Sequence, residues 1–314
     1  MFRKFISVIP TAICGLALGI SALSNLLYIM ERNVLATIFL IISVIVVGLF
    51  ILKCIKFPRI VLKELSDRNI CATFPTITMT FLTLLYILYH QLNITWEIII
   101  WLWWLVVILQ FIIIGLFIYY HIYLHKNEHI VPSTSWFVTF VGIGVISETA
   151  EDFSPFFGEL IVYIATLCFL ILICIVLFKK TWRLYNENQF PMTIIIAAPA
   201  SLCLNGYLLS VEHTQLFYII PMLIISQLIF IYSLTFIPKL YKLNFRFSFS
   251  ALTFPWVTTA TSLYNLLEIE TLPYKVQNVL YFVTIFEVIF AIVTVIYVIL
   301  GYASFLKKRT IEIK

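Results

Sequence analysis

The 314-residue chain is 62% hydrophobic and only 11% charged, with a formal net charge of +5. This composition excludes a water-soluble domain, because apolar runs of about 18–20 residues are typical of transmembrane helices and they take up nearly the whole chain. The six cysteines form no CxxC pair and predict neither a disulfide framework nor a metal site. We expect no enzymatic activity, no metal and no cofactor.

In chain order, the apolar runs predict ten membrane-spanning helices. The first run also has features of a signal peptide, since basic residues precede an apolar core; we favour an uncleaved first helix, and cleavage would leave nine spans. The chain is then a single all-α transmembrane domain, residues 1–314. The predicted spans are residues 8–29, 34–54, 72–91, 95–119, 131–149, 156–178, 191–211, 214–237, 247–267 and 276–302.

The basic residues predict the topology. All but two of the 20 lysines and arginines fall in the termini or in the segments that join an even-numbered span to the next odd one. The exceptions are Arg32 and Lys275. Because basic residues stay on the cytoplasmic side, we expect a multi-pass protein of the inner or plasma membrane with both termini cytoplasmic. The positive charge then faces membrane lipids and predicts no nucleic-acid partner.

Two kinds of span alternate along the chain. The odd-numbered spans are richer in Gly, Pro, Ser and Thr than the even ones, and each carries a proline soon after its cytoplasmic entry. These prolines recur about every sixty residues, which indicates one helical hairpin repeated five times. Small and hydroxyl residues belong at close helix contacts or along a wet cavity. We therefore expect the odd helices to form an inner pore ring and the even helices an outer layer.

Such a ring predicts a polar but uncharged pore. An uncharged lumen binds ions weakly, which suits fast passage, and anion preference would come from helix dipoles at the breaks and from the basic cytoplasmic mouth. Glu287, in the middle of the tenth span, is a candidate for proton coupling, because a buried intramembrane carboxylate is a functional candidate by default. The residues expected to kink or line the pore are Pro10, Thr11, Gly15, Pro75, Thr78, Pro132, Ser135, Gly142, Pro199, Ser201, Pro255 and Thr258.

The ordered set of inner-helix motifs resembles a known family. The segments "IPTAICGLALGISALS" at 9–24, "FPTITM" at 74–79, "MTIIIAAPASLCLNGYL" at 192–208 and "TFPWVTTATSLY" at 253–264 are similar to the tellurite-resistance and dicarboxylate transporter family. That family includes the bacterial TehA proteins and the slow-type anion channels of plant guard cells. The chain departs from the bacterial members at Ala17, where a second proline is expected, and by lacking a deeper proline after Pro132.

The resemblance implies a homotrimer with one pore in each protomer. It also implies that a phenylalanine of the ninth helix closes the pore, and in this sequence that residue is Phe254. Position alone is compatible with this role, because Phe254 lies eight residues beyond Arg246, or roughly 12 Å into a core about 30 Å thick. By position alone, however, a packing or lipid-facing phenylalanine is the favoured explanation.

Three functions follow as alternatives. The first is an anion channel that passes small anions such as chloride or nitrate. The second is a secondary carrier that exports dicarboxylate, sulfite or tellurite-related anions, with proton coupling through Glu287. The third is a membrane receptor or scaffold without transport activity. Channel and carrier can share this architecture, so the sequence does not decide between them.

Overall fold

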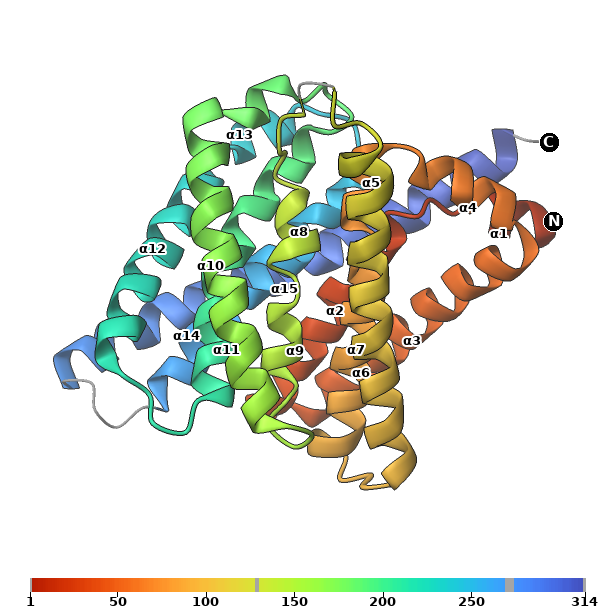
Figure 1. Cartoon of the computed structure of the whole chain (residues 1–314). Coiled ribbons are helices and arrows are strands. Elements are labelled where there is room, and N and C mark those ends of the chain that lie inside the picture. Colours follow the sequence, from red (N-terminus) through yellow and green to blue (C-terminus); the bar gives the residue numbers. More distant parts are fainter. Residues whose placement is uncertain (1, 128–129, 269–273, 313–314) are drawn as a thin grey trace.

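The computed structural model describes residues 2–127, 130–268 and 274–312, and every regular element within these ranges is a helix (Figure 1). Five long helices expose rows of Ile, Leu, Val and Phe side chains, as lipid-facing helices do. Only 28–39% of their most apolar windows is buried inside the protein. These helices are α3 (Asn33–Lys56), α7 (Glu97–Ile118), α10 (Pro155–Lys179), α12 (Leu216–Leu234) and α15 (Tyr274–Glu312).

Between the long helices run five segments that are each broken into shorter helices. In two of them, residues 68–91 and 190–210, the most apolar window is 72% and 89% buried. The five pairs are α1 (Phe2–Val8) with α2 (Ile13–Ile29), α5 (Arg68–Thr73) with α6 (Thr76–Tyr86), α8 (Trp136–Phe140) with α9 (Gly144–Glu148), the 3₁₀ helix η4 (Phe190–Ala197) with α11 (Ala198–Ser210), and the 3₁₀ helix η5 (Phe247–Leu252) with α14 (Thr253–Leu267).

Five further short helices of the described chain follow four of the long helices and the inner helix α6. They are α4 (Pro58–Leu65) after α3, the π-helical turns η1 (Ile87–Gln91) after α6 and η2 (Tyr119–Tyr123) after α7, the 3₁₀ turn η3 (Thr181–Leu184) after α10, and α13 (Ile237–Tyr241) after α12.

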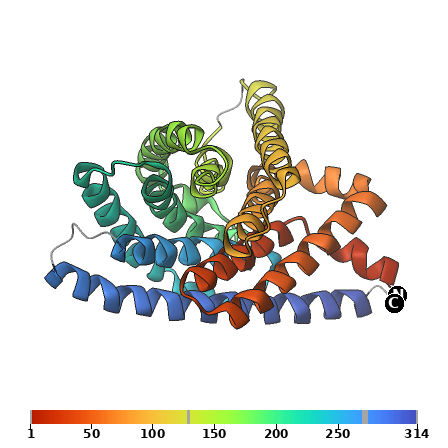
Figure 2. The same cartoon turned by 90° about the horizontal axis from the view of Figure 1, so that it is seen from below.

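The broken segments close into a ring. Helix α2 contacts α6, α6 contacts α9, α9 contacts α11, α11 contacts α14, and α14 returns to α2. Each of these helices also contacts the long helix that follows it, so the long helices lie outside the ring. Figure 2 shows α15 lying across one side of the molecule, and its far end meets α1. The N-terminal and C-terminal segments therefore lie on the same side.

The prolines explain why the inner segments are broken. Pro10 lies in the turn before α2, Pro75 is the N-cap of α6, and Pro132 lies in the non-helical stretch before α8. Pro199 and Pro255 lie in the first turns of α11 and α14. A proline lacks the backbone N–H, but the first turn of a helix does not use those donors internally. The prolines thus mark where new helices begin.

The breaks also affect how many membrane crossings can be recognised from helix length. Seven helices of the described chain are long and apolar enough to cross a membrane, and Ile13–Ile29 is a shorter apolar helix. The predicted spans 131–149 and 247–267 are each divided between short elements. The all-α membrane class is confirmed, whereas ten spans in five hairpins stay a prediction.

A glycine sets the distance between α2 and α14. A Cβ atom at Gly19 would overlap the Thr253 side chain and come within 2.9 Å of the Phe254 backbone nitrogen. Gly48, on the outer face of α3, has no atom within 4 Å of the same position. Gly19 therefore permits a close approach of two backbones, which is the usual role of small residues between membrane helices.

We expect Gly19→Ala to destabilise the protein by about 1–3 kcal/mol, because the added methyl group must push α14 away from α2. Gly48→Ala is the matched control, and it should be neutral or stabilise the protein by up to about 1 kcal/mol through helix propensity. Thermal unfolding of the detergent-solubilised protein measures both. Equal melting temperatures for the two variants would contradict the close contact.

Candidate functional site

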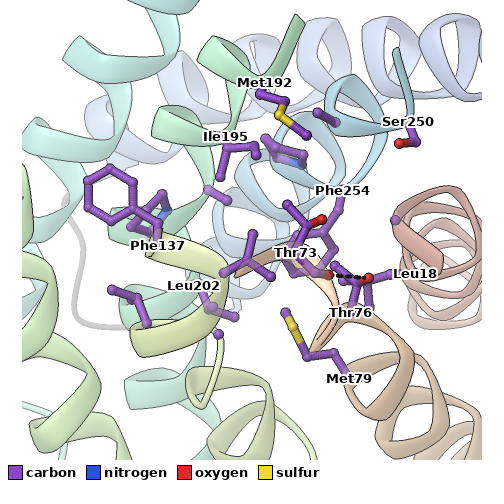
Figure 3. A pocket seen from close by; sticks show the side chains of 18 of the residues that line it. Leu18, Thr73, Thr76, Met79, Phe137, Met192, Ile195, Leu202, Ser250 and Phe254 are labelled. Carbon is purple, nitrogen blue, oxygen red and sulfur yellow. Dashed lines mark hydrogen bonds between the residues drawn. The ribbon is translucent and has the colours of Figure 1, made fainter. Parts of the chain in front are cut away.

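A cavity lies inside the ring, and all five broken segments line it (Figure 3). Its residues come from the start of α2, from α5 and α6, from α8 and the turn after it, from η4 and α11, and from η5 and α14. The lining residues are Ala12, Gly15, Leu18, Thr73, Thr76, Met79, Phe137, Val138, Val141, Gly142, Met192, Ile195, Ala198, Pro199, Leu202, Ser250, Ala251, Phe254 and Pro255.

The cavity is narrow and mostly apolar. The space open to the centres of water molecules is about 50 Å³, and one water needs about 10–15 Å³ by this measure, so only a few waters fit. None of the lining residues carries a charge. The Thr76 hydroxyl donates to the Thr73 carbonyl oxygen at 2.8 Å and is thereby engaged with the backbone. A narrow apolar constriction of this kind opposes the entry of hydrated ions.

Four helices begin at this cavity. The lining residues Gly15, Thr76, Pro199 and Phe254 lie in the first turns of α2, α6, α11 and α14. The amino end of a helix carries a partial positive charge, although the first N–H groups of α2 already donate to the carbonyl oxygens of Pro10, Thr11 and Ala12. The cavity therefore borders the amino ends of four helices, and neither a lysine nor an arginine lines it.

Phe254 is the large side chain that α14 places at the cavity. It is half-buried and lies in the first turn of α14, where Figure 3 shows it among side chains of the other segments. The preceding residue anchors it, because the Thr253 hydroxyl lies 2.8 Å from the Ser250 carbonyl oxygen and 3.3 Å from the Gly15 carbonyl oxygen. The backbone that carries the Phe254 ring is thus tied to α2.

Of the residues expected to kink or line the pore, Gly15, Gly142, Pro199 and Pro255 lie at the cavity with Phe254. The other eight do not line it. Pro10, Pro75 and Pro132 stand at or before helix starts, and Ser201 and Thr258 are buried elsewhere.

Three expected lining hydroxyls have partners outside the cavity. Thr11 donates to Glu64, Thr78 donates to the Gln110 side chain of α7, and Ser135 donates to the Asn69 side-chain oxygen of α5 at 3.3 Å. These hydroxyls hold neighbouring segments together, and the cavity surface is correspondingly more apolar than a lumen lined by hydroxyl groups.

Glu287 also lies away from the cavity. Its side chain is fully buried on α15, beside Gln227 of α12 and Thr259 of α14. Neither carboxylate oxygen has a hydrogen-bond partner among the described residues. Glu287 is therefore a buried group between inner and outer helices that does not touch the contents of the cavity.

Several lining residues were not predicted from the sequence, notably Thr73, Met79 and Ser250. A signal for them exists, because each lies within four residues of a proline or of Phe254 at a helix start. Residues three or four apart share a helix face, so residues close to the breaks are the expected lining of the cavity.

Comparison with known proteins gives one result. The model of the SLAC1 family, described as voltage-dependent anion channel, matches residues 4–303. Among curated proteins, none matches the chain. The family match covers every residue that lines the cavity.

Beyond the cavity, at the opposite end of the inner helices from α1, Asn265, Asn205 and Glu148 are linked by two hydrogen bonds; we call this chain of side chains the relay. The Asn265 amide donates to the Asn205 oxygen at 2.7 Å, and the Asn205 amide donates to a Glu148 carboxylate oxygen at 2.8 Å. The three residues come from α14, α11 and α9. Asn205 is the middle member, and it joins three segments of the ring at one point.

We expect Asn205→Leu to lower the melting temperature about twice as much as Asn265→Leu. The first variant leaves two groups without their partner and the second leaves one, and each buried unpaired polar group costs about 1–3 kcal/mol. Thermal unfolding of the purified protein in detergent measures both. If Asn265→Leu is the more destabilising variant, the relay does not join the segments in this way.

Proposed function

The chain belongs to the voltage-dependent anion channel family, and from this premise we propose that it is a membrane channel for small inorganic anions such as chloride or nitrate. Family membership supports anion transport across a membrane. The proposal of a channel for small inorganic anions rests on one observation. Five broken segments surround an uncharged cavity, and Phe254 lies at its wall.

Anion selectivity follows from the helix starts. The first turns of α2, α6, α11 and α14 supply partial positive charge at the cavity, and no fixed lysine or arginine binds the ion tightly. An anion is therefore favoured in the pore yet held weakly enough to leave, which is the condition for conduction.

Phe254 is the proposed gate. Its ring has no charge and no polar group, so it closes the pore by filling space and by excluding water. The space left for water in the cavity is small, and a turn of one aromatic ring changes it substantially. The lining groups that would border the open path are small, among them Gly15, Gly142 and Ala198.

The proposed architecture has ten crossings and one pore in each protomer of a homotrimer. Each broken segment runs alongside a long helix, so it can cross the bilayer even though its component helices are short. The α1 end and the α15 end lie on one side, and the basic residues favour the cytoplasm for that side. The trimer rests on the family resemblance alone.

A secondary carrier for dicarboxylate, sulfite or tellurite-related anions is the second candidate. The buried Glu287 carboxylate favours it, because an intramembrane acid is a typical proton-coupling group. Glu287 does not line the cavity, so in a carrier it would act through movement of α14 against α15 without touching the substrate.

Phe254→Ala should raise the anion current through reconstituted protein on the order of tenfold, equivalent to removing a barrier of about 1.4 kcal/mol. The physical reason is the loss of the ring that fills the cavity. Planar-bilayer recording with chloride, nitrate and gluconate solutions measures current and selectivity. Phe286→Ala is the matched control, since Phe286 is 53% exposed on the outer face of α15 and its loss should leave the current unchanged.

A conducting wild type with an unchanged Phe254→Ala variant would show that Phe254 is not the gate. Absence of flux in both, with correctly folded protein, would favour a receptor or scaffold.

The Glu287→Gln variant distinguishes the channel hypothesis from the carrier hypothesis, because the two predict different transport in this variant. A channel should keep its unitary current steps in this variant, because Glu287 lies outside the cavity. A proton-coupled carrier should lose saturable, pH-driven flux, because glutamine cannot take up a proton. Liposome flux assays with an imposed pH gradient measure this, and loss of coupled flux without current steps would overturn the channel proposal.

A further inference from the structure

A buried lysine lies at the end of α3, close to the first break. The side chain of Lys53 is fully buried, and no other lysine or arginine in the described part of the chain is. Its ammonium group donates to both oxygens of the Glu64 carboxylate, at 2.6 and 2.7 Å. A buried charge is stable only when a partner neutralises it, so a protonated Lys53 requires an anion at this position.

The same carboxylate is held by Thr11. The Thr11 backbone N–H donates to Glu64 Oε2 at 2.8 Å, and the Thr11 hydroxyl donates to the same oxygen. An ammonium group, an amide N–H and a hydroxyl thus converge on one negatively charged group. This is the donor set that proteins use for small anions, and charge-assisted hydrogen bonds of this kind are strong.

The site adjoins the cavity. Thr11 directly precedes Ala12, which lines the cavity, and Pro10 ends the helical run before it. Lys53 lies on α3, which packs against α2. The converging donors therefore stand beside the end of the cavity that is nearest to α1.

The two partners differ in how firmly they are placed. Lys53 is fully buried on a 24-residue helix, whereas Glu64 is 27% exposed and lies near the end of the eight-residue helix α4. The only buried residue of α4 is Val61. The carboxylate can therefore move toward solvent while Lys53 and Thr11 keep their positions, and it would leave behind a cationic site open on the solvent side.

We propose that Lys53 and Thr11 form an anion-binding site that Glu64 occupies as a tethered anion. A small monovalent anion such as chloride takes the site when the Glu64 carboxylate leaves it. The basic residues Lys56, Arg59 and Lys63 lie on the same short stretch and raise the local concentration of anions. The choice of ligand rests on the proposed transport of anions, but the site itself is separate from the Phe254 gate.

The test is chloride-dependent stability of Glu64→Ala. A ligand that binds only the folded protein raises its melting temperature. At chloride concentrations about 100 times the dissociation constant, we expect the Glu64→Ala variant to melt roughly 5–10 °C higher than in gluconate of equal ionic strength. Wild type should shift far less, because Glu64 already fills the site.

Lys53→Met/Glu64→Ala is the matched control, since it removes the cation as well as the carboxylate. It should lose the chloride effect. Glu64→Gln serves as a second variant if Glu64→Ala does not fold in gluconate; it keeps the shape, loses the charge, and should also be stabilised by chloride.

Identical melting temperatures in chloride and gluconate for both Glu64 variants would overturn the proposal and leave Lys53–Glu64 as a structural ion pair. A chloride effect that persists in the Lys53→Met double variant would overturn it as well, because the anion would then bind elsewhere. Melting does not depend on current, so a failed Phe254 gate and a failed Lys53 site are distinguishable.

Discussion

The constraint behind this structure is that a broken helix inside a membrane leaves backbone groups without internal partners, and hydrocarbon offers none. The breaks are tolerated here because they lie within a ring that the long helices surround. Neighbouring segments supply the missing partners: the Thr139 hydroxyl donates to the Ala72 carbonyl oxygen at 2.7 Å, and the Thr134 hydroxyl to the Met192 carbonyl oxygen at 2.8 Å. The ring and its cavity are consequences of satisfying these groups.

The same breaks determine the electrostatics. Because new helices start beside the cavity, their positive ends border it, while no charged side chain lines it. Ionisable side chains lie instead near the two ends of the inner segments. The Lys53–Glu64 pair stands near the first break, and the Glu148–Asn205–Asn265 relay stands at the opposite end.

The family and the all-α membrane class could be predicted from the sequence, because hydropathy and the proline repeat are properties of residue order. Which side chains face the cavity could not. After each break the helical phase changes, since 3₁₀ turns such as η4 and η5 advance by 3.0 residues per turn and α-helices by 3.6. The phase set at the start of α6 places Thr76 at the cavity, and Thr78, two residues later in the same helix, faces Gln110 of α7 on the other side. Lys53 was expected in a cytoplasmic segment, and its burial depends on where α4 folds back.

The start of α2 connects the features described above. Its Gly15 carbonyl lies within hydrogen-bond distance of Thr253, which carries Phe254, and its Thr11 holds the Glu64 carboxylate. These two contacts are four residues apart, about one helical turn. Gly19, one turn further on, brings the backbone of α14 close enough for the Thr253 contact. A displacement of the α2 start would therefore move both the support of the Phe254 ring, the proposed gate, and the donors of the proposed anion site. Binding at one is in a position to affect the other without any long-range rearrangement.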